Sequence, residues 1–357
     1  MTRAARTDVL PVCGLLLGFL ALYSVVGVAF HRRAPMAFAY LDQLFDADVP
    51  SRIIDITRFA GPHHRTQYHP LFVLFLNPAG VLLKTLLRAF EVEQAGRLAA
   101  ILLCAAAGAL GVVAFFRLLR GNGLEVLTAA AWSVVFGLSA SQVFFSVFPE
   151  SWVFSTLALL LLFGGEGRPV ARVASGVLAF GMAVTNVVAV ALAPPPGGDA
   201  EKRSSLRPRA VFVLGVVAVA AGLSVVQTVV YTDTAPFWRV SGLGRDDRLS
   251  FVWPSHPRDV VARISDLVPY FLEWNLAAPR TVTQRDESRT VVDFPRGAGP
   301  RPAGGFHAAL WGALVAAAVV RAARTGSWRR PLVAALALWT LALAALHLVF
   351  GTSLFLY

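Results

Sequence analysis

Charged residues are scarce in this sequence. They make up 15% of its 357 residues, whereas 56% are hydrophobic and the mean hydropathy is +0.63. Soluble domains carry about 25% charged residues, so this composition excludes a soluble protein. The apolar residues instead form blocks of about 18 to 25, the length of helix that crosses a hydrocarbon layer roughly 30 Å thick. The sequence therefore predicts an all-α, multi-pass membrane protein.

Cysteine is also scarce, and alternating hydrophobicity is missing. Cys13 and Cys104 both lie inside apolar blocks, so the sequence supports neither a disulfide framework nor a thiolate metal site. Segments of about ten residues with alternating apolar and polar positions, typical of an outer-membrane barrel, are not seen.

The apolar blocks predict about 8 to 10 transmembrane helices. A weaker block covers residues 70–90, and the N-terminal block is long enough for a retained first span rather than a cleaved signal peptide. The clear blocks are 9–30, 98–116, 124–147, 152–163, 172–194, 210–231, 306–320 and 331–350.

The positions of the charged linkers, compared with the number of membrane crossings that precede each of them, refine this count. If every block crossed once, the linker holding Arg117 and Arg120 would face outside, against the positive-inside rule. The weak block contains Asn77-Pro78-Ala-Gly80, which we interpret as a break in a re-entrant or interfacial segment. The block at 172–194 then crosses twice, as two short helices that meet near Asn186.

This solution puts the basic clusters and the N-terminus on the cytoplasmic side. The net charge of +11 is thus an orientation signal and does not indicate nucleic acid. Most acidic residues and all seven histidines fall on the extracytoplasmic side. The predicted parts are a transmembrane module (1–231) with a first outer loop (31–69), a second outer loop (232–305) with an amphipathic surface helix near 260–272, and C-terminal transmembrane helices (306–357).

The first outer loop carries the strongest candidates for chemistry. Asp46 and Asp48 lie two residues apart just beyond a span. Such a pair can share a cation or divide into a general base and an orienting group. A divalent cation, Mg²⁺ or Mn²⁺, is therefore left open as a cofactor. Alternatively, Asp48 is the N-cap of a helix with Pro50 in its first turn.

Basic and imidazole groups follow in the same loop. His63, His64 and His69 lack a zinc-type spacing and are candidates for substrate binding, with His69 as a candidate phosphate ligand. Arg52 and Arg65 suit an anion such as phosphate, and ordinary solvation of a loop is an equal alternative.

Three further residues are candidates from other segments. Glu150 lies at the outer junction of two spans, where it is either a site residue or a helix-start residue favoured by the helix dipole. Asn186 is either a site residue or a turn residue. His347 lies within an apolar span, where polar groups are costly and tend to be functional.

Together these features resemble the GT-C superfamily of membrane glycosyltransferases, in particular the protein mannosyltransferase and aminoarabinose transferase branch. The resemblance covers roughly residues 1–230 and is one of layout. It rests on the acidic pair, the His69-Pro-Leu segment, Arg97 at the start of a span, the Pro149-Glu150 junction and a Gly-x4-Gly-x3-Thr-Asn segment.

The resemblance implies a polyprenyl-phosphate sugar donor, an unknown acceptor and an outward-facing active site. It also implies that an aspartate of the first outer loop is the catalytic base, here Asp46 or Asp48. Asn186 departs from the family because relatives often carry Lys there. A transporter, which also uses broken helices and charges at membrane depth, and a non-catalytic scaffold are the alternatives.

Overall fold

The apolar blocks form helices in the computed structural model. The structure describes residues 8–41, 47–63, 65–164, 169–194, 206–239, 261, 282–286, 289–293, 302–326 and 331–350. The helical elements are α2 (Val9–Arg33), η1 (Pro35–Phe38), α3 (Val49–Thr57), α4 (Phe72–Ala89), α5 (Ala95–Gly121), α6 (Val126–Leu138), α7 (Ala140–Val147), α8 (Trp152–Gly164), α9 (Pro169–Met182), η2 (Val184–Asn186), α10 (Val187–Leu192), α12 (Leu206–Val230), α15 (Pro302–Thr325) and α16 (Pro331–Phe350).

Four helices of the described residues are long and apolar enough to cross a membrane: α2, α4, α5 and α12. The number rises to five if α6 and α7, which meet at a bend of 62°, form one span. The other apolar helices α8 and α9 have only 13 and 14 residues, fewer than the roughly 20 that cross a bilayer unaided. The structure thus contains several helices that could span a membrane, as predicted. The larger number of 8 to 10 spans stays a prediction.

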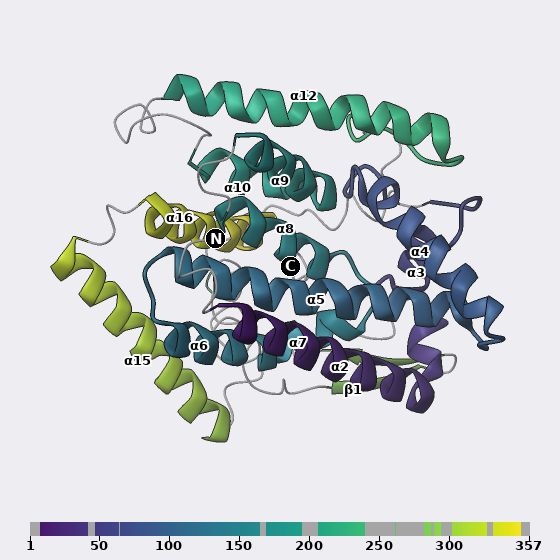
Figure 1. Cartoon of the computed structure of the whole chain (residues 1–357), viewed down its shortest axis with the longest axis horizontal. Helices are drawn as coiled ribbons and strands as arrows, with labels where there is room; N and C mark the ends of the chain where they lie inside the picture. Colours follow the sequence, from purple (N-terminus) through teal and green to yellow (C-terminus); the bar gives the residue numbers. More distant parts are fainter. Residues whose placement is uncertain are drawn as a thin grey trace. The chain divides into compact units, whose positions relative to one another are not determined.

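The chain divides into two compact units, and the larger contains α2 to α12. Within it, α5 packs against α2, α6 and α8. Helix α9 lies between α8 and α12 and packs against both (Figure 1). Asp8, just before α2, pairs with Arg120 in the last turn of α5 at 3.2 Å, so these helices are antiparallel. A small residue also lets α5 approach α7 closely, because a Cβ on Gly108 would lie 2.1 Å from Ser146 Oγ.

The block at 172–194 folds into two helices joined by a turn, and its predicted double crossing of the membrane stays a prediction because α9 has 14 residues and α10 only six. α9 ends at Met182, and α10 begins five residues later after a turn of 3₁₀ helix. The guanidinium of Arg172, near the start of α9, donates a hydrogen bond to the carbonyl of Pro194, beyond the end of α10. The two ends of the segment therefore lie together, with Asn186 at the turn between its helices.

The predicted break at Asn77-Pro78 is wrong, because α4 is continuous through both residues. The Asn77 amide instead donates to the carbonyl oxygens of Asp55 at 2.8 Å and Arg58 at 2.6 Å, at the C-terminal end of α3. Helix ends leave such carbonyls unpaired, so Asn77 stabilises α3. The Asn77-Pro78 motif is therefore part of a continuous helix, and it forms the surface on which α3 docks.

Gly80 completes this docking surface. A Cβ at Gly80 would lie 2.1 Å from the carbonyl oxygen of Ile56, so only glycine lets α3 approach α4 this closely. One turn further along α4, Lys84 Nζ donates to the carbonyl of Thr57 at 2.8 Å. Three positions of α4 thus fix the end of α3.

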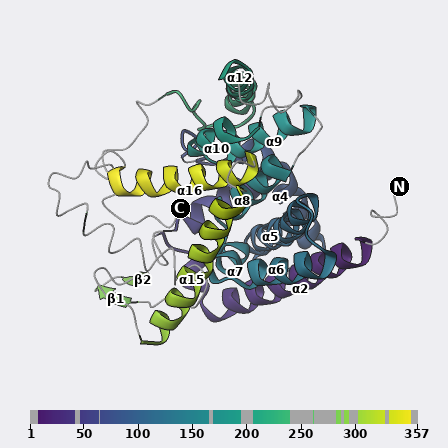
Figure 2. The same cartoon turned by 90° about the vertical axis from the view of Figure 1, so that its left-hand side faces the viewer.

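The smaller unit contains α15, α16 and two short strands. β1 (Val282–Asp286) and β2 (Arg289–Asp293) pair antiparallel, with Val282 opposite Asp293 (Figure 2). The described residues are otherwise helical, so the predicted all-α class is confirmed apart from this hairpin. The strands are rich in Val and Thr, which favour β structure, but they are too short and polar to appear as an apolar block. The predicted surface helix near 260–272 lies outside the described residues, except for residue 261.

Candidate functional site

One end of the larger unit gathers segments that are far apart in the sequence. Asp48, just before α3, donates its backbone N–H to Glu150 Oε1 at 2.7 Å, across 102 positions of the chain. Thr66 exchanges hydrogen bonds with Ala235, which follows α12. The first outer loop, the junction at Glu150 and the segment after α12 therefore lie together, as their predicted placement on one side of the membrane requires.

Asp48 occupies the N-cap position of α3 but does not use its side chain as a cap. Pro50 lies in the first turn of this helix, as predicted. The Asp48 carboxylate instead forms an ion pair with Arg65. Arg65 adopts a φ of 59°, a left-handed conformation that costs a non-glycine residue of the order of 1 kcal/mol and that collects at functional sites. The Arg65 side chain is 41% exposed, so this pair forms the accessible rim of the site.

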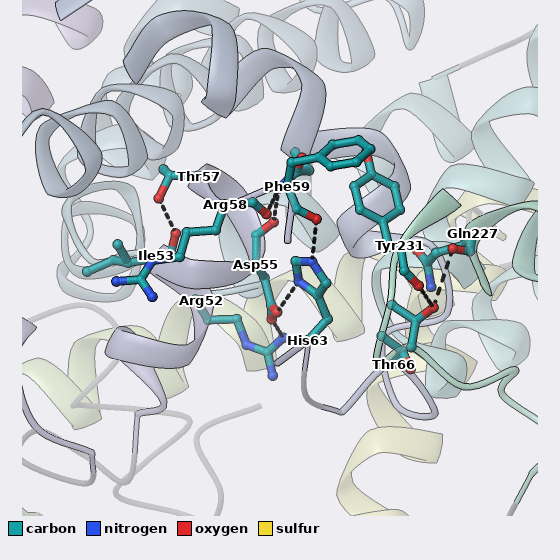
Figure 3. Close-up of polar contacts among 12 residues, drawn as sticks. Arg52, Ile53, Asp55, Thr57, Arg58, Phe59, His63, Thr66, Gln227 and Tyr231 are labelled. Atoms are coloured by element: carbon teal, nitrogen blue, oxygen red, sulfur yellow. Dashed lines mark hydrogen bonds and ion pairs between the residues drawn. The ribbon is translucent and has the colours of Figure 1, made fainter. Parts of the chain in front are cut away.

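Behind the rim lies a buried chain of charged groups (Figure 3). Arg52 Nη1 contacts Asp55 Oδ2 at 2.7 Å, and Asp55 Oδ1 contacts His63 Nδ1 at 3.2 Å. All three side chains are almost completely buried. The i,i+3 spacing puts Arg52 and Asp55 on one face of α3, and His63 reaches them from the following loop. Asp55 thus bridges the helix and the loop.

The remaining nitrogens of Arg52 are less well satisfied. Arg52 Nε lies 3.9 Å from Glu150 Oε2, too far for a hydrogen bond, and Nη2 has no hydrogen-bond partner among the described residues. The guanidinium carbon lies 5.4 Å from the centre of the Phe72 ring. An unsatisfied buried donor costs about 1–3 kcal/mol, so this edge of Arg52 is suited to an anionic oxygen.

Glu150 is buried between these groups. Its carboxylate accepts hydrogen bonds from the backbone N–H groups of Asp48 at 2.7 Å and Ser151 at 3.1 Å. Burial raises the pKa of Glu150 above its ordinary value, the nearby Asp48 charge raises it further, and Arg52 acts in the opposite direction. Glu150 is therefore an acid whose ionisation the protein disfavours, and it is tied directly to the backbone of Asp48.

His69 is held as a neutral imidazole. Its Nδ1 donates to the carbonyl oxygen of Met182 at 2.6 Å, where α9 ends. Burial lowers the pKa of His69 from 6.5 to about 3, and the charges of Arg52 and Arg65 add to this effect. A neutral imidazole lacks the positive charge expected of a phosphate ligand. The contact instead fastens the first outer loop to the turn between α9 and α10.

Asn186 lies within that turn and is buried. Its amide donates to Ser155 Oγ at 2.7 Å and to the carbonyl of Ala179 at 2.9 Å. These contacts fit the turn role, because they satisfy polar groups next to a helix end.

The remaining predicted residues lie outside the described part of the larger unit. Asp46 and His64 lie outside the described residues, and His347 lies in α16 of the smaller unit. Among the described residues no group of three or more His, Cys, Asp or Glu side chains is arranged to hold a metal ion. A role for Mg²⁺ or Mn²⁺ stays a prediction.

Sequence reasoning missed Asp55 and Gln227. The spacing of Arg52 and Asp55 is a local signal for their pairing, but the contact with His63 depends on the loop. Gln227 lies within an apolar block and is completely buried. It accepts from Leu74 N–H and donates to the carbonyl of Pro70, both at 3.0 Å. A lone amide in a predicted span was the available signal.

Comparison with family models, with curated proteins and with solved structures found no match for this chain.

Proposed function

We propose that this chain is a membrane glycosyltransferase that moves a sugar from a polyprenyl-phosphate donor to an acceptor hydroxyl on the extracytoplasmic face. One observation carries the proposal: the Asp48–Arg65 ion pair at an accessible rim, joined through the Asp48 backbone to Glu150. A carboxylate next to an accessible cation is what this reaction needs, since the lipid phosphate is already a good leaving group.

The chemical step requires one base and a means of holding phosphate. The acceptor oxygen attacks C1 of the sugar, and its proton passes to the carboxylate of Asp48, or of Asp46 as the alternative base. The bond between C1 and the phosphate oxygen breaks, and both its electrons leave with the lipid phosphate. Arg65, drawn away from Asp48 by the phosphate, stabilises the departing charge, and the unpaired edge of Arg52 lies behind it.

Glu150 acts as a positioning residue in this scheme. Its hydrogen bond to the Asp48 N–H fixes the start of α3, so the base has a defined position relative to Arg52 and Arg65. Burial raises the pKa of Glu150, so a second negative charge next to the base is disfavoured.

The orientation follows the sequence argument. The N-terminus is placed in the cytoplasm of a cell membrane, and the end of the larger unit that holds Asp48 and Glu150 is placed outside. The contact between Asp48 and Glu150 supports this placement, because residues in contact lie on one side of the membrane.

The broken segment α9–η2–α10 favours a second candidate, a transporter. Discontinuous helices are typical of substrate sites in transporters. The continuity of α4 weakens this alternative, because its supposed break was the other sign of a transport pathway.

The test is to incubate the purified protein with labelled polyprenyl-phosphate sugars and acceptors and to measure release of the lipid phosphate. We expect Asp48→Asn or Asp46→Asn to abolish release while the protein inserts normally. Asp233→Asn is the matched control, since Asp233 is exposed and has a positive φ that asparagine also tolerates.

Full transfer by both single variants would disprove the base assignment. If the unmodified protein releases no lipid phosphate from any donor, but moves a labelled sugar across a vesicle membrane, the transporter is the better explanation.

A further inference from the structure

His69 lies beside the cations of the candidate site. Its ring centre is 6.1 Å from that of Phe72, and the guanidinium carbon of Arg52 is 5.4 Å from the same Phe72 ring. The backbone N–H of His69 donates to the carbonyl of Arg65 at 3.0 Å, so one turn of chain separates these two residues. In addition to burial, the charges of Arg52 and Arg65 lower the pKa of His69. His69 is therefore close to the groups assigned to the donor phosphate.

The backbone on each side of His69 is fixed to the end of α9. Val184 donates its N–H to the carbonyl of Tyr68 at 2.9 Å, and Leu71 donates its N–H to the carbonyl of Gly181 at 2.9 Å. A Cβ on Gly181 would lie 2.8 Å from Leu71 Cβ, so a larger residue would force these segments apart. Together with the Nδ1 contact described above, these bonds give the imidazole a defined orientation.

The protonation of the His69 ring follows from its partner. A carbonyl oxygen only accepts hydrogen bonds, so Nδ1 carries the proton in the contact with Met182. In a neutral ring Nε2 then has a lone pair and can only accept. Nε2 lies across the ring from Nδ1 and has no hydrogen-bond partner in the described part of the chain, and His69 keeps partial access to solvent. His69 therefore offers one free acceptor to a ligand.

This free acceptor suits one part of a lipid-linked sugar and not another. The phosphodiester is an anion whose oxygens only accept, so it pairs with arginine and forms no hydrogen bond with the Nε2 lone pair. A sugar hydroxyl can donate. In a polyprenyl-phosphate donor the sugar is bonded directly to the phosphate, so its hydroxyls lie next to the position assigned to Arg52 and Arg65.

We propose that His69 Nε2 accepts a hydrogen bond from a hydroxyl group of the donor sugar and makes the site selective for sugars that carry this hydroxyl. The inference rests on the proposed function, because it takes the lipid-linked sugar as the ligand. The acceptor hydroxyl is the other source of the same chemistry, but its proton is assigned to the catalytic aspartate. A deoxy sugar would leave Nε2 without its partner, and sites that bond a hydroxyl discriminate against analogues without it.

The test measures the affinity of donors for the full chain in detergent by titration calorimetry, without an acceptor. The ligands are polyprenyl-phosphate mannose, glucose and galactose, the monodeoxy forms of the sugar that binds best, and polyprenyl phosphate without a sugar. The main variant is His69→Asn, because the asparagine amide can take the place of Nδ1 and donate to Met182, whereas nothing replaces Nε2. The matched control is Asp233→Asn, at an exposed position.

We expect one monodeoxy donor to bind the unmodified protein about five-fold more weakly than the complete donor, the effect of one hydrogen bond between neutral groups. His69→Asn should bind the complete donor about five-fold more weakly, bind that deoxy donor as the unmodified protein does, and bind polyprenyl phosphate unchanged. Asp233→Asn should behave like the unmodified protein. A merely structural role of His69 would instead weaken all three ligands alike.

Three results would overturn the inference: equal affinity of the unmodified protein for all monodeoxy donors and the complete donor, the same discrimination in His69→Asn, or weaker binding of polyprenyl phosphate by this variant. The first comparison needs no variant and decides even if His69→Asn does not fold. Any of these results together with release of lipid phosphate in the transfer assay leaves the proposed function standing. Absence of both donor binding and release removes the proposed function and this inference together.

Discussion

Removing Asp55 tests the buried charge chain most directly. Asp55 is the one acidic side chain within hydrogen-bond distance of Arg52 in the described part of the chain, at 2.7 Å, and it also contacts His63. In Asp55→Ala, Arg52 stays buried with a carboxylate no closer than 3.9 Å, that of Glu150. The variant therefore leaves a charge in the interior without a close counter-charge.

The expected loss of stability follows from that geometry. Breaking a buried ion pair by removing one partner costs about 3–5 kcal/mol. Asp55→Asn keeps an oxygen that accepts from Arg52 and should lose about 2 kcal/mol, the value of a hydrogen bond to a charged group. For Asp55→Ala we expect a fall in the melting temperature of roughly 5–15 °C.

The assay is thermal unfolding of the detergent-solubilised protein, followed by tryptophan fluorescence at one fixed heating rate. Asp233→Ala is the control for loss of an exposed aspartate. The double variant Arg52→Met/Asp55→Leu separates pairing from packing. Replacing a buried pair by apolar residues of similar volume is often nearly neutral, so this variant should be more stable than Asp55→Ala.

Two results would refute this reasoning. One is a melting temperature for Asp55→Ala equal to that of Asp233→Ala. The other is a loss in the double variant equal to the sum of the losses caused by Arg52→Met and Asp55→Leu, since independent residues give additive effects.

Three other predictions follow from the larger unit. Gly80→Ala should destabilise the protein by about 1–3 kcal/mol in denaturant unfolding, because its Cβ would meet a backbone oxygen, whereas Gly18→Ala has open space and should be neutral or slightly stabilising. His69 has a pKa of about 3 when folded, below its ordinary 6.5, so its contribution to stability is present above pH 6.5 and is lost as the pH falls towards 3; His69→Gln should flatten this part of the stability profile. Reporter tags at Arg120 and Glu150 should report opposite sides of the membrane, with Glu150 outside, and labelling on the same side would contradict the topology.

Sequence reasoning succeeded where one strong physical term dominates. Burying backbone in lipid demands helices, so the apolar blocks predicted most helices closely. The number of crossings and the arginine placement also predicted that the segment at 172–194 crosses twice and that Glu150 lies on the same side as Asp48. The contact between Glu150 and Asp48 agrees with a shared side, and the contact of Arg172 with Pro194 agrees with a segment that turns back, whereas the two crossings stay a prediction.

It failed where the decisive contact is distant in the sequence. The motif at Asn77-Pro78 has the composition of a helix break, and only the position of α3 shows that Asn77 binds the end of that helix instead. The bend between α6 and α7 lies inside a block with uniform hydropathy. The importance of Asp55 depends on His63, whose position is set by the packing of the loop against Tyr231 after α12.

The docking of α3 has a consequence for how this protein can diverge among species. Asn77 and Lys84 hold α3 by the backbone oxygens of Asp55, Arg58 and Thr57. A backbone oxygen is present whichever amino acid occupies the position, so mutations on the exposed side of α3 leave its attachment intact. The sequence of the exposed side of α3 can therefore change while the backbone contacts of Asn77 and Lys84 are kept.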